Sequence, residues 1–233
     1  MSIAVSARAN AVTMALAVAL AGGPAAAHHV GVYVPRDNEV SANFKQIKFA
    51  LQARKFDVAL RLFDNGALRA EMRARAADLP AGLEAATRGA IGAGDVPAAE
   101  RWLMVLFAAL ARDLAREADR RLADPGGSAE ARGAVGRKFL EAITRYYSLI
   151  DFAVSQHDSK AAVAARLALD DAEGYAKDAG PPPAGAPGST LKGTTGRPVA
   201  APDPAKMREP LQRIAQTLSR LIETSSTSTR RSP

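Results

Sequence analysis

The stretch "DVPAAERWLMVLFAALARDLAREADRRLA", residues 95–123, holds the longest helical pattern in the chain and decides its fold class. Its leucines recur at spacings of three and four and therefore share one face of an α-helix: Leu103, Leu106, Leu110 and Leu114. Asp95 can cap the first turn, in which Pro97 is tolerated. The apolar run 102–111 is ten residues long, whereas a membrane-spanning helix needs roughly 20. The stretch therefore predicts one long helix in a packed, soluble helical core.

The composition of the whole chain favours the same fold class. Hydrophobic residues make up 48% of the 233 residues, but aromatic residues only 5%. Alanine, leucine, arginine and glutamate form helices readily, whereas strands favour β-branched and aromatic residues. The chain has no cysteine, which excludes disulfides, thiolate metal sites and cysteine nucleophiles. We therefore predict an all-α protein, built as a helical bundle or as a short stack of helical hairpins.

Helical patterns continue on both sides of residues 95–123. We expect further helices from Val40 to a break near Arg54, from Phe56 to Gly66, and over 67–79, 82–91, 130–156 and 158–175. The helix over 130–156 has an apolar stripe that ends near Ala153. Together these patterns predict a core domain over residues 39–178, preceded by an extended arm over residues 28–38.

The composition changes sharply after the predicted core. Residues 179–204 contain seven prolines and five glycines and are predicted to be a linker. Residues 205–224 then form an amphipathic pattern with a stripe of Met207, Leu211, Ile214, Leu218 and Leu221. An isolated helix of this length is only marginally stable in water, so it must dock either on its own bundle or on another molecule. Residues 225–233 are predicted to be a disordered tail.

The first 27 residues have the order of a secretory signal. Arg8 precedes an apolar run over 11–21, and Ala25-Ala26-Ala27 offers the small residues that a signal peptidase recognises. We therefore predict an exported protein, periplasmic in a Gram-negative host, whose mature chain begins at His28 and has no transmembrane segment.

The formal charge of +7 does not by itself identify a partner. Basic and acidic residues alternate along the predicted helices, as in "RDLAREADRR" over 112–121, which is typical of a solvated helix face. The sequence contains no motif of a nucleic-acid-binding fold. We expect the partner to be a protein or peptide in the periplasm.

Two histidines at the expected cleavage site are candidate metal ligands. A free α-amine and the imidazole of His28 can chelate copper or another divalent transition metal, with His29 as a further nitrogen ligand. This terminus resembles the histidine-first termini of secreted copper oxygenases and copper carriers. Cleavage after Ala26 would place a histidine third, which also suits Cu(II) or Ni(II). The alternative is a solvated histidine pair without a bound metal.

Other candidate ligands lie near the end of the predicted core. His157 falls at a helix end, where it can have a structural role or act as a metal ligand or general base. Asp170, Asp171 and Glu173 could bind a hard cation, although the loop spacing of an EF-hand is absent. No Glu-x-x-His pair accompanies these carboxylates, which disfavours a di-iron site.

Three helix–turn–helix junctions are similar to those of tetratricopeptide repeats. "ARKFDVALRLFD", residues 53–64, places a polar turn before Phe56 and a small Ala59 where two helices would touch. "GAGDVPAAERWL", residues 92–103, places Ala99 similarly, and residues 155–166 match more loosely. The resemblance implies stacked helical hairpins with a concave, peptide-binding face. A closed up-and-down bundle fits the same pattern.

These observations lead to two functional hypotheses. The first is an exported, non-enzymatic accessory or binding protein that acts through a helical groove and the tethered C-terminal helix. The alternative is a periplasmic metal-handling protein that binds metal at its N-terminal histidines. An enzyme is less favoured, because the sequence lacks Gly-x-Ser-x-Gly, P-loop, His-Glu-x-x-His and Rossmann motifs. We predict no catalytic or cofactor-binding residues.

Overall fold

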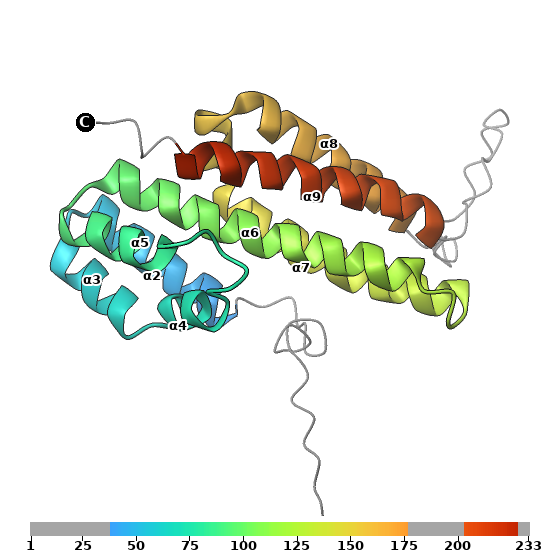
Figure 1. Cartoon of the computed structure of the whole chain (residues 1–233), viewed down its shortest axis with the longest axis horizontal. Helices are drawn as coiled ribbons and strands as arrows, with labels where there is room; N and C mark the ends of the chain where they lie inside the picture. Colours follow the sequence, from blue (N-terminus) through green and yellow to red (C-terminus); the bar gives the residue numbers. More distant parts are fainter. Residues whose placement is uncertain (1–37, 177–202, 228–233) are drawn as a thin grey trace, which may run out of the picture. The chain divides into compact units, whose positions relative to one another are not determined.

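A computed structural model describes residues 38–176 and 203–227, all within one compact unit of the chain (Figure 1). Within these residues every regular element is a helix, which confirms the all-α prediction. The helices are α2 (Glu39–Gln52), α3 (Phe56–Asp64), α4 (Ala67–Ala74), α5 (Leu83–Gly92), α6 (Val96–Ala123), α7 (Ala129–His157), α8 (Ser159–Ala176) and α9 (Pro204–Thr227). The predicted signal, nearly all of the predicted arm and most of the predicted linker lie outside the described residues.

The starts of three helices follow from local sequence. Asn38, Asp95 and Asp158 each accept a hydrogen bond from the backbone N–H three residues later, at 2.8, 3.0 and 2.9 Å. Each bond satisfies one of the N–H groups that the first turn of a helix leaves without a partner. The cap predicted at Asp95 is therefore confirmed, and Asn38 and Asp158 cap α2 and α8 in the same way.

Helix α4 is shorter than predicted. The expected helix over 67–79 ends at Ala74, and the chain continues to Pro80 in tight turns. The backbone N–H groups of Ala76 and Asp78 bond to carbonyls three residues back. Two features oppose a helix here. Leu79 precedes Pro80, and helical geometry is disfavoured for a residue before proline. The side chain of Leu79 is also buried, at 8% exposure.

Helices α6, α7, α8 and α9 form a four-helix bundle. The chief contacts join α6 with α7, α7 with α8, α8 with α9, and α9 with α6. All residues from Trp102 to Ala111 are buried, because α5, α7 and α9 also surround this part of α6. A helix that is apolar on every side is expected to be buried on every side. No helix among the described residues is long and apolar enough to cross a membrane.

Helix α9 packs against α6 and α8, as Figure 1 shows. Its predicted stripe is buried, with every member at 1% exposure or less. Arg208 of α9 pairs with Asp119 of α6 at 2.7 Å, and Arg213 pairs with Asp171 of α8. In the described structure this helix therefore docks on its own bundle. We call this contact the α9 seam.

The C-terminal helix also extends further than expected. Residues 225–227 fall in the predicted disordered tail, yet they belong to α9. The hydroxyl groups of Thr224 and Thr227 donate to carbonyls three and four residues back. Ser225 is fully buried and contacts His157. This side-chain bonding and burial hold the last turn in place.

Helices α2 to α5 pack together before the chain enters α6. Asn43 of α2 donates to the carbonyl of Leu62 at 3.1 Å and accepts from the backbone N–H of Leu68 at 3.1 Å. It thereby satisfies one backbone group at the end of α3 and one at the start of α4. Gly66 lies so close to Asn43 and Leu62 that a side chain there would clash with both.

A charged cluster joins α3, α4 and α5. Asp64 accepts hydrogen bonds from Arg88 at 2.9 Å and from Arg69 at 2.8 Å. Glu84 accepts from Arg69 and from Arg73. Hydrogen bonds from Arg88 and Arg69, respectively, lower the pKa of Asp64 and of Glu84 below their usual values, against the opposing effect of burial. The arginines of this cluster are therefore matched by carboxylates.

Candidate binding groove

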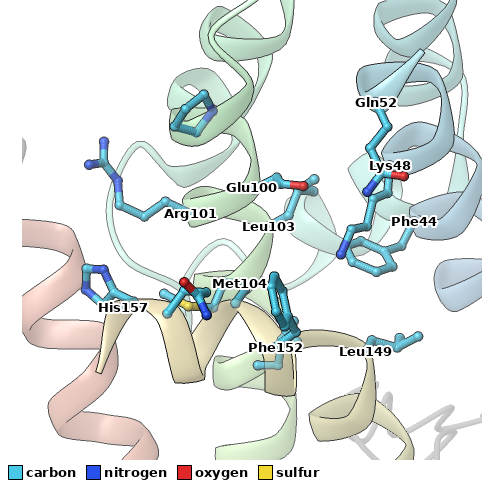
Figure 2. Close-up of a pocket in the computed structure, with 14 residues that line it drawn as sticks. Phe44, Lys48, Gln52, Glu100, Arg101, Leu103, Met104, Leu149, Phe152 and His157 are labelled. Carbon is cyan, nitrogen blue, oxygen red and sulfur yellow. The ribbon is translucent and has the colours of Figure 1, made fainter. Parts of the chain in front are cut away.

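A groove opens where α2, the first half of α6 and the end of α7 meet (Figure 2). Its volume is about 330 Å³. Its lining comprises Phe44, Lys48 and Gln52 of α2, Pro97, Glu100, Arg101, Leu103 and Met104 of α6, and Leu149, Ile150, Phe152, Ala153, Gln156 and His157 of α7. We call it the α2–α6–α7 groove.

The position of α2 in this groove is set by aromatic contacts below it. Phe44 meets Phe107 of α6 edge to face at 4.7 Å, and Phe107 meets Tyr146 of α7 at 5.5 Å. The amide of Asn38 donates to the hydroxyl of Tyr146 at 2.7 Å. Lys48 follows Phe44 by four residues, so it lies one turn further along the same side of α2. These edge-to-face ring contacts thus fix the wall that carries Lys48.

The floor of the groove is apolar and packed. Phe44, Leu103, Met104 and Ile150 have exposures of 5%, 1%, 2% and 2%. Each of these side chains also belongs to the core, so the floor is held rigidly by the packing beneath it. Such a floor offers a preformed surface for apolar side chains of a ligand.

The rim of the groove carries an aromatic side chain that the fold leaves open. Phe152 lines the groove yet is 71% exposed. Single exposed apolar residues are common on soluble proteins, but an exposed aromatic that lines an apolar groove marks a contact site.

Charged side chains on the walls lack partners among the described residues. Lys48, Glu100 and Arg101 form no ion pair with one another or with any other described residue. The Nε of Arg101 is buried and has no hydrogen-bond partner in the part of the chain that the structure describes. Its guanidinium carbon lies 5.1 Å from the centre of the Trp102 ring. The groove therefore combines an apolar floor with two cations and one carboxylate that no described residue pairs.

His157 lies where the groove meets α9. Its Nε2 is 3.0 Å from the hydroxyl oxygen of Ser225. His157 lies one turn beyond Ala153, where the predicted apolar stripe ends, and it is exposed. The reason is that α8 packs on one side of α7, so that the end of α7 buries Val154 rather than Ala153.

The other predicted metal ligands lie on α8 or outside the described residues. Asp171 pairs with Arg213 of α9, while Asp170 and Glu173 are exposed on α8. No group of three histidines or carboxylates within residues 38–176 and 203–227 is arranged to hold a metal ion. His28 and His29 lie outside the described residues, so a copper-binding terminus stays a prediction.

Tyr147 and Asp151 form a polar face of α7 that contacts α8. The hydroxyl of Tyr147 donates to the carbonyl of Ala162 at 3.3 Å, and Asp151 accepts two hydrogen bonds from Arg166 at 2.8 Å each. Burial raises the pKa of Tyr147 above its usual range, and the negative charge of Asp151 raises it further. These residues join two helices of the bundle.

Sequence reasoning predicted a helical groove but did not locate its residues. Phe152 falls outside the apolar stripe of its helix. That displacement is the one signal in the sequence that could have identified it, since a large aromatic on a polar face is rarely needed for folding.

No protein-family model, curated protein or solved structure matches the chain at a significant level. The function must therefore be inferred from the chemistry of the groove itself.

Proposed function

We propose that this protein is an exported binding protein whose α2–α6–α7 groove holds an amphipathic peptide segment of a partner protein. The observation that carries the proposal is the apolar floor beside an aromatic rim that none of the described residues covers. Phe152 is 71% exposed although it borders a cavity of about 330 Å³. Apolar anchors that enter a preformed pocket are the usual centre of a peptide interface.

The dimensions of this site favour a peptide over a small molecule. The cavity volume is at the lower end of the roughly 300–1,000 Å³ of small-molecule sites. A ligand that fills it and also covers Phe152 must extend beyond the cavity. A peptide does this naturally, because alternate or successive side chains can occupy the floor and the rim together.

The C-terminal helix supports the proposal only indirectly. The stripe of α9 is covered by α6 and α8, so α9 could present it to a partner only by leaving the bundle. The groove, in contrast, is open in the docked state. We therefore assign partner binding to the groove and a structural role to α9, in place of the tethered-helix mechanism suggested by the sequence.

Export would place the partner outside the cytoplasm. The signal predicted over residues 1–27 supports this part of the proposal. N-terminal sequencing of the chain secreted from its host tests it, and we expect the first residue to be His28. A mature chain that still begins at Met1 would contradict export by this signal.

The binding proposal can be tested by peptide display. The full chain and its Phe152→Ser variant would be panned in parallel against a random dodecapeptide library, with Leu167→Ser as the control. Leu167 is 57% exposed on α8 and is not part of the groove lining, so its variant changes a comparable apolar surface elsewhere. Circular dichroism would show that all three proteins are folded.

We expect peptides rich in paired apolar residues to be enriched on the wild type and on Leu167→Ser. The same peptides should be lost on Phe152→Ser, because that variant removes the rim contact. Enrichment of no peptide, or equal enrichment on all three proteins, would contradict peptide binding in this groove.

A further inference from the structure

We infer that the peptide held in the α2–α6–α7 groove carries a carboxylate beside its apolar anchors, and that Arg101 is the residue that recognises it. The inference rests on the proposed function and names the chemical class of the ligand. It follows from the incomplete hydrogen bonding of Arg101, from the packing that holds its guanidinium, and from the charges of the other wall residues.

Arg101 is the wall residue whose hydrogen bonding is incomplete. Its Nε is buried without a partner among the described residues, although nearly all buried donors in folded proteins have one. The residue as a whole is only partly buried and lines the groove. The terminal N–H groups of the Arg101 guanidinium form no hydrogen bond or ion pair with a described residue, so an acceptor that enters the groove would meet donors without a partner there.

The Arg101 guanidinium is also held in place before any ligand arrives. Its central carbon lies 5.1 Å from the centre of the Trp102 ring, and Trp102 is itself 8% exposed. Contact with an aromatic face stabilises a cation and restricts its orientation. A planar guanidinium that is fixed in this way is suited to two parallel hydrogen bonds with a carboxylate.

The other wall charges favour an acidic ligand over a basic one. Figure 2 shows Arg101 and His157 on the side where α9 passes, and Lys48 beside Phe44 on the α2 side. Lys48 and Arg101 contribute two positive charges, and Glu100 is the one carboxylate in the lining. None of the three is paired with a described residue. The net charge of the walls therefore attracts a carboxylate, while Glu100 remains free to accept from peptide N–H groups.

The experiment compares two versions of one selected peptide. A peptide enriched on the wild type would be synthesised with a fluorescein label, once with its acidic residue as glutamate and once as glutamine. Binding of both versions would be measured by fluorescence anisotropy on the full chain and on Arg101→Met, which keeps the apolar stem of the side chain but removes the guanidinium and its charge. Lys138→Met is the matched control, because Lys138 is an exposed cation of α7 outside the groove lining.

We expect the glutamine version to bind the wild type about 10- to 100-fold more weakly, as for the loss of a charged hydrogen bond. The two versions should differ by less than about twofold on Arg101→Met, and Lys138→Met should behave as the wild type. Arg101→Lys keeps the charge without the planar fork and should give an intermediate ratio. This second variant decides the question if Arg101→Met does not fold.

Three outcomes would overturn the inference. Peptides enriched on the wild type could contain no more aspartate and glutamate than the starting library. The two peptide versions could bind the wild type equally, or their ratio could persist in Arg101→Met. In each case peptide binding that still depends on Phe152 would leave the proposed function intact. If no peptide binds at all, the proposed function fails, and the ligand assignment fails with it.

Discussion

The α9 seam and the α2–α6–α7 groove are both lined by apolar side chains, but they differ in how far those side chains are buried and in how their charges are paired. In the seam, every member of the α9 stripe is at most 1% exposed. In the groove, Phe152 is 71% exposed. The charges differ in the same way, because Arg208 and Arg213 of the seam form ion pairs, whereas Arg101 of the groove forms none with a described residue. The seam completes the fold, and the groove remains available for a ligand.

The comparison predicts that seam residues control stability. Leu218 is fully buried in the seam, so Leu218→Ala should lower the free energy of unfolding by about 2–5 kcal/mol through lost burial and a residual cavity. Urea denaturation followed by circular dichroism measures this. Leu167→Ala on the exposed face of α8 should change stability by no more than about 0.5 kcal/mol. Equal effects of the two changes would break the distinction between seam and surface.

A second test concerns tight packing away from both regions. Gly66→Ala would place a Cβ against Asn43 and the Leu62 carbonyl and should cost about 1–3 kcal/mol of unfolding free energy. Gly89, in the middle of α5, has no neighbour within 4 Å of such a Cβ. Gly89→Ala should therefore stabilise the chain by about 0.5–1 kcal/mol through helix propensity. Thermal melts that show the reverse order would contradict this packing.

The charged cluster of α3 to α5 provides a smaller, pH-dependent effect. Because Arg88 and Arg69 depress the pKa of Asp64 and Glu84 in the folded chain, these carboxylates stabilise the fold at neutral pH. That contribution is lost as the pH falls below about 4, where the carboxylates become protonated. Between pH 5 and pH 3 the wild type should lose more unfolding free energy than Asp64→Asn does. The excess loss should be under about 1 kcal/mol. The difference should shrink in 1 M salt, and its persistence there would contradict an electrostatic cause.

A substitution at the rim of the groove should change stability less than the substitutions in the seam, at Gly66 or in the charged cluster. Phe152→Ser removes an aromatic side chain that is mostly in water already, so the free energy of unfolding should change by no more than about 0.5 kcal/mol. Urea denaturation of this variant beside Leu218→Ala sharpens the comparison within one experiment. A loss similar to that of Leu218→Ala would mean that Phe152 belongs to the core.

Much of the fold could be predicted because its signals are local. Asp95 and Asp158 cap helices through bonds to residues three positions later, and the α9 stripe repeats within one helix. The exposure of His157, in contrast, depends on neighbours in other helices. Asp171 illustrates the same limit, since its partner Arg213 lies 42 residues away. The spacing of the acidic residues on α8 therefore suggested a cation site but could not indicate that pairing.

The groove is less predictable than the fold, because three helices from separate parts of the chain create it. Periodicity assigns each residue to a face of its own helix, but not to a particular neighbour. Phe152 stands out only as an aromatic on a polar face. The unsatisfied Nε of Arg101 is a property of the packed structure, and no sequence pattern reports it.

The most direct test of the account is the affinity of one display-selected, fluorescein-labelled peptide for three folded proteins: the wild type, Phe152→Ser and Leu167→Ser. Fluorescence anisotropy should give equal affinity for the wild type and Leu167→Ser, and a loss of at least about tenfold for Phe152→Ser, as for an interface anchor. Equal affinity for all three proteins would contradict the claim that the open groove is the binding site.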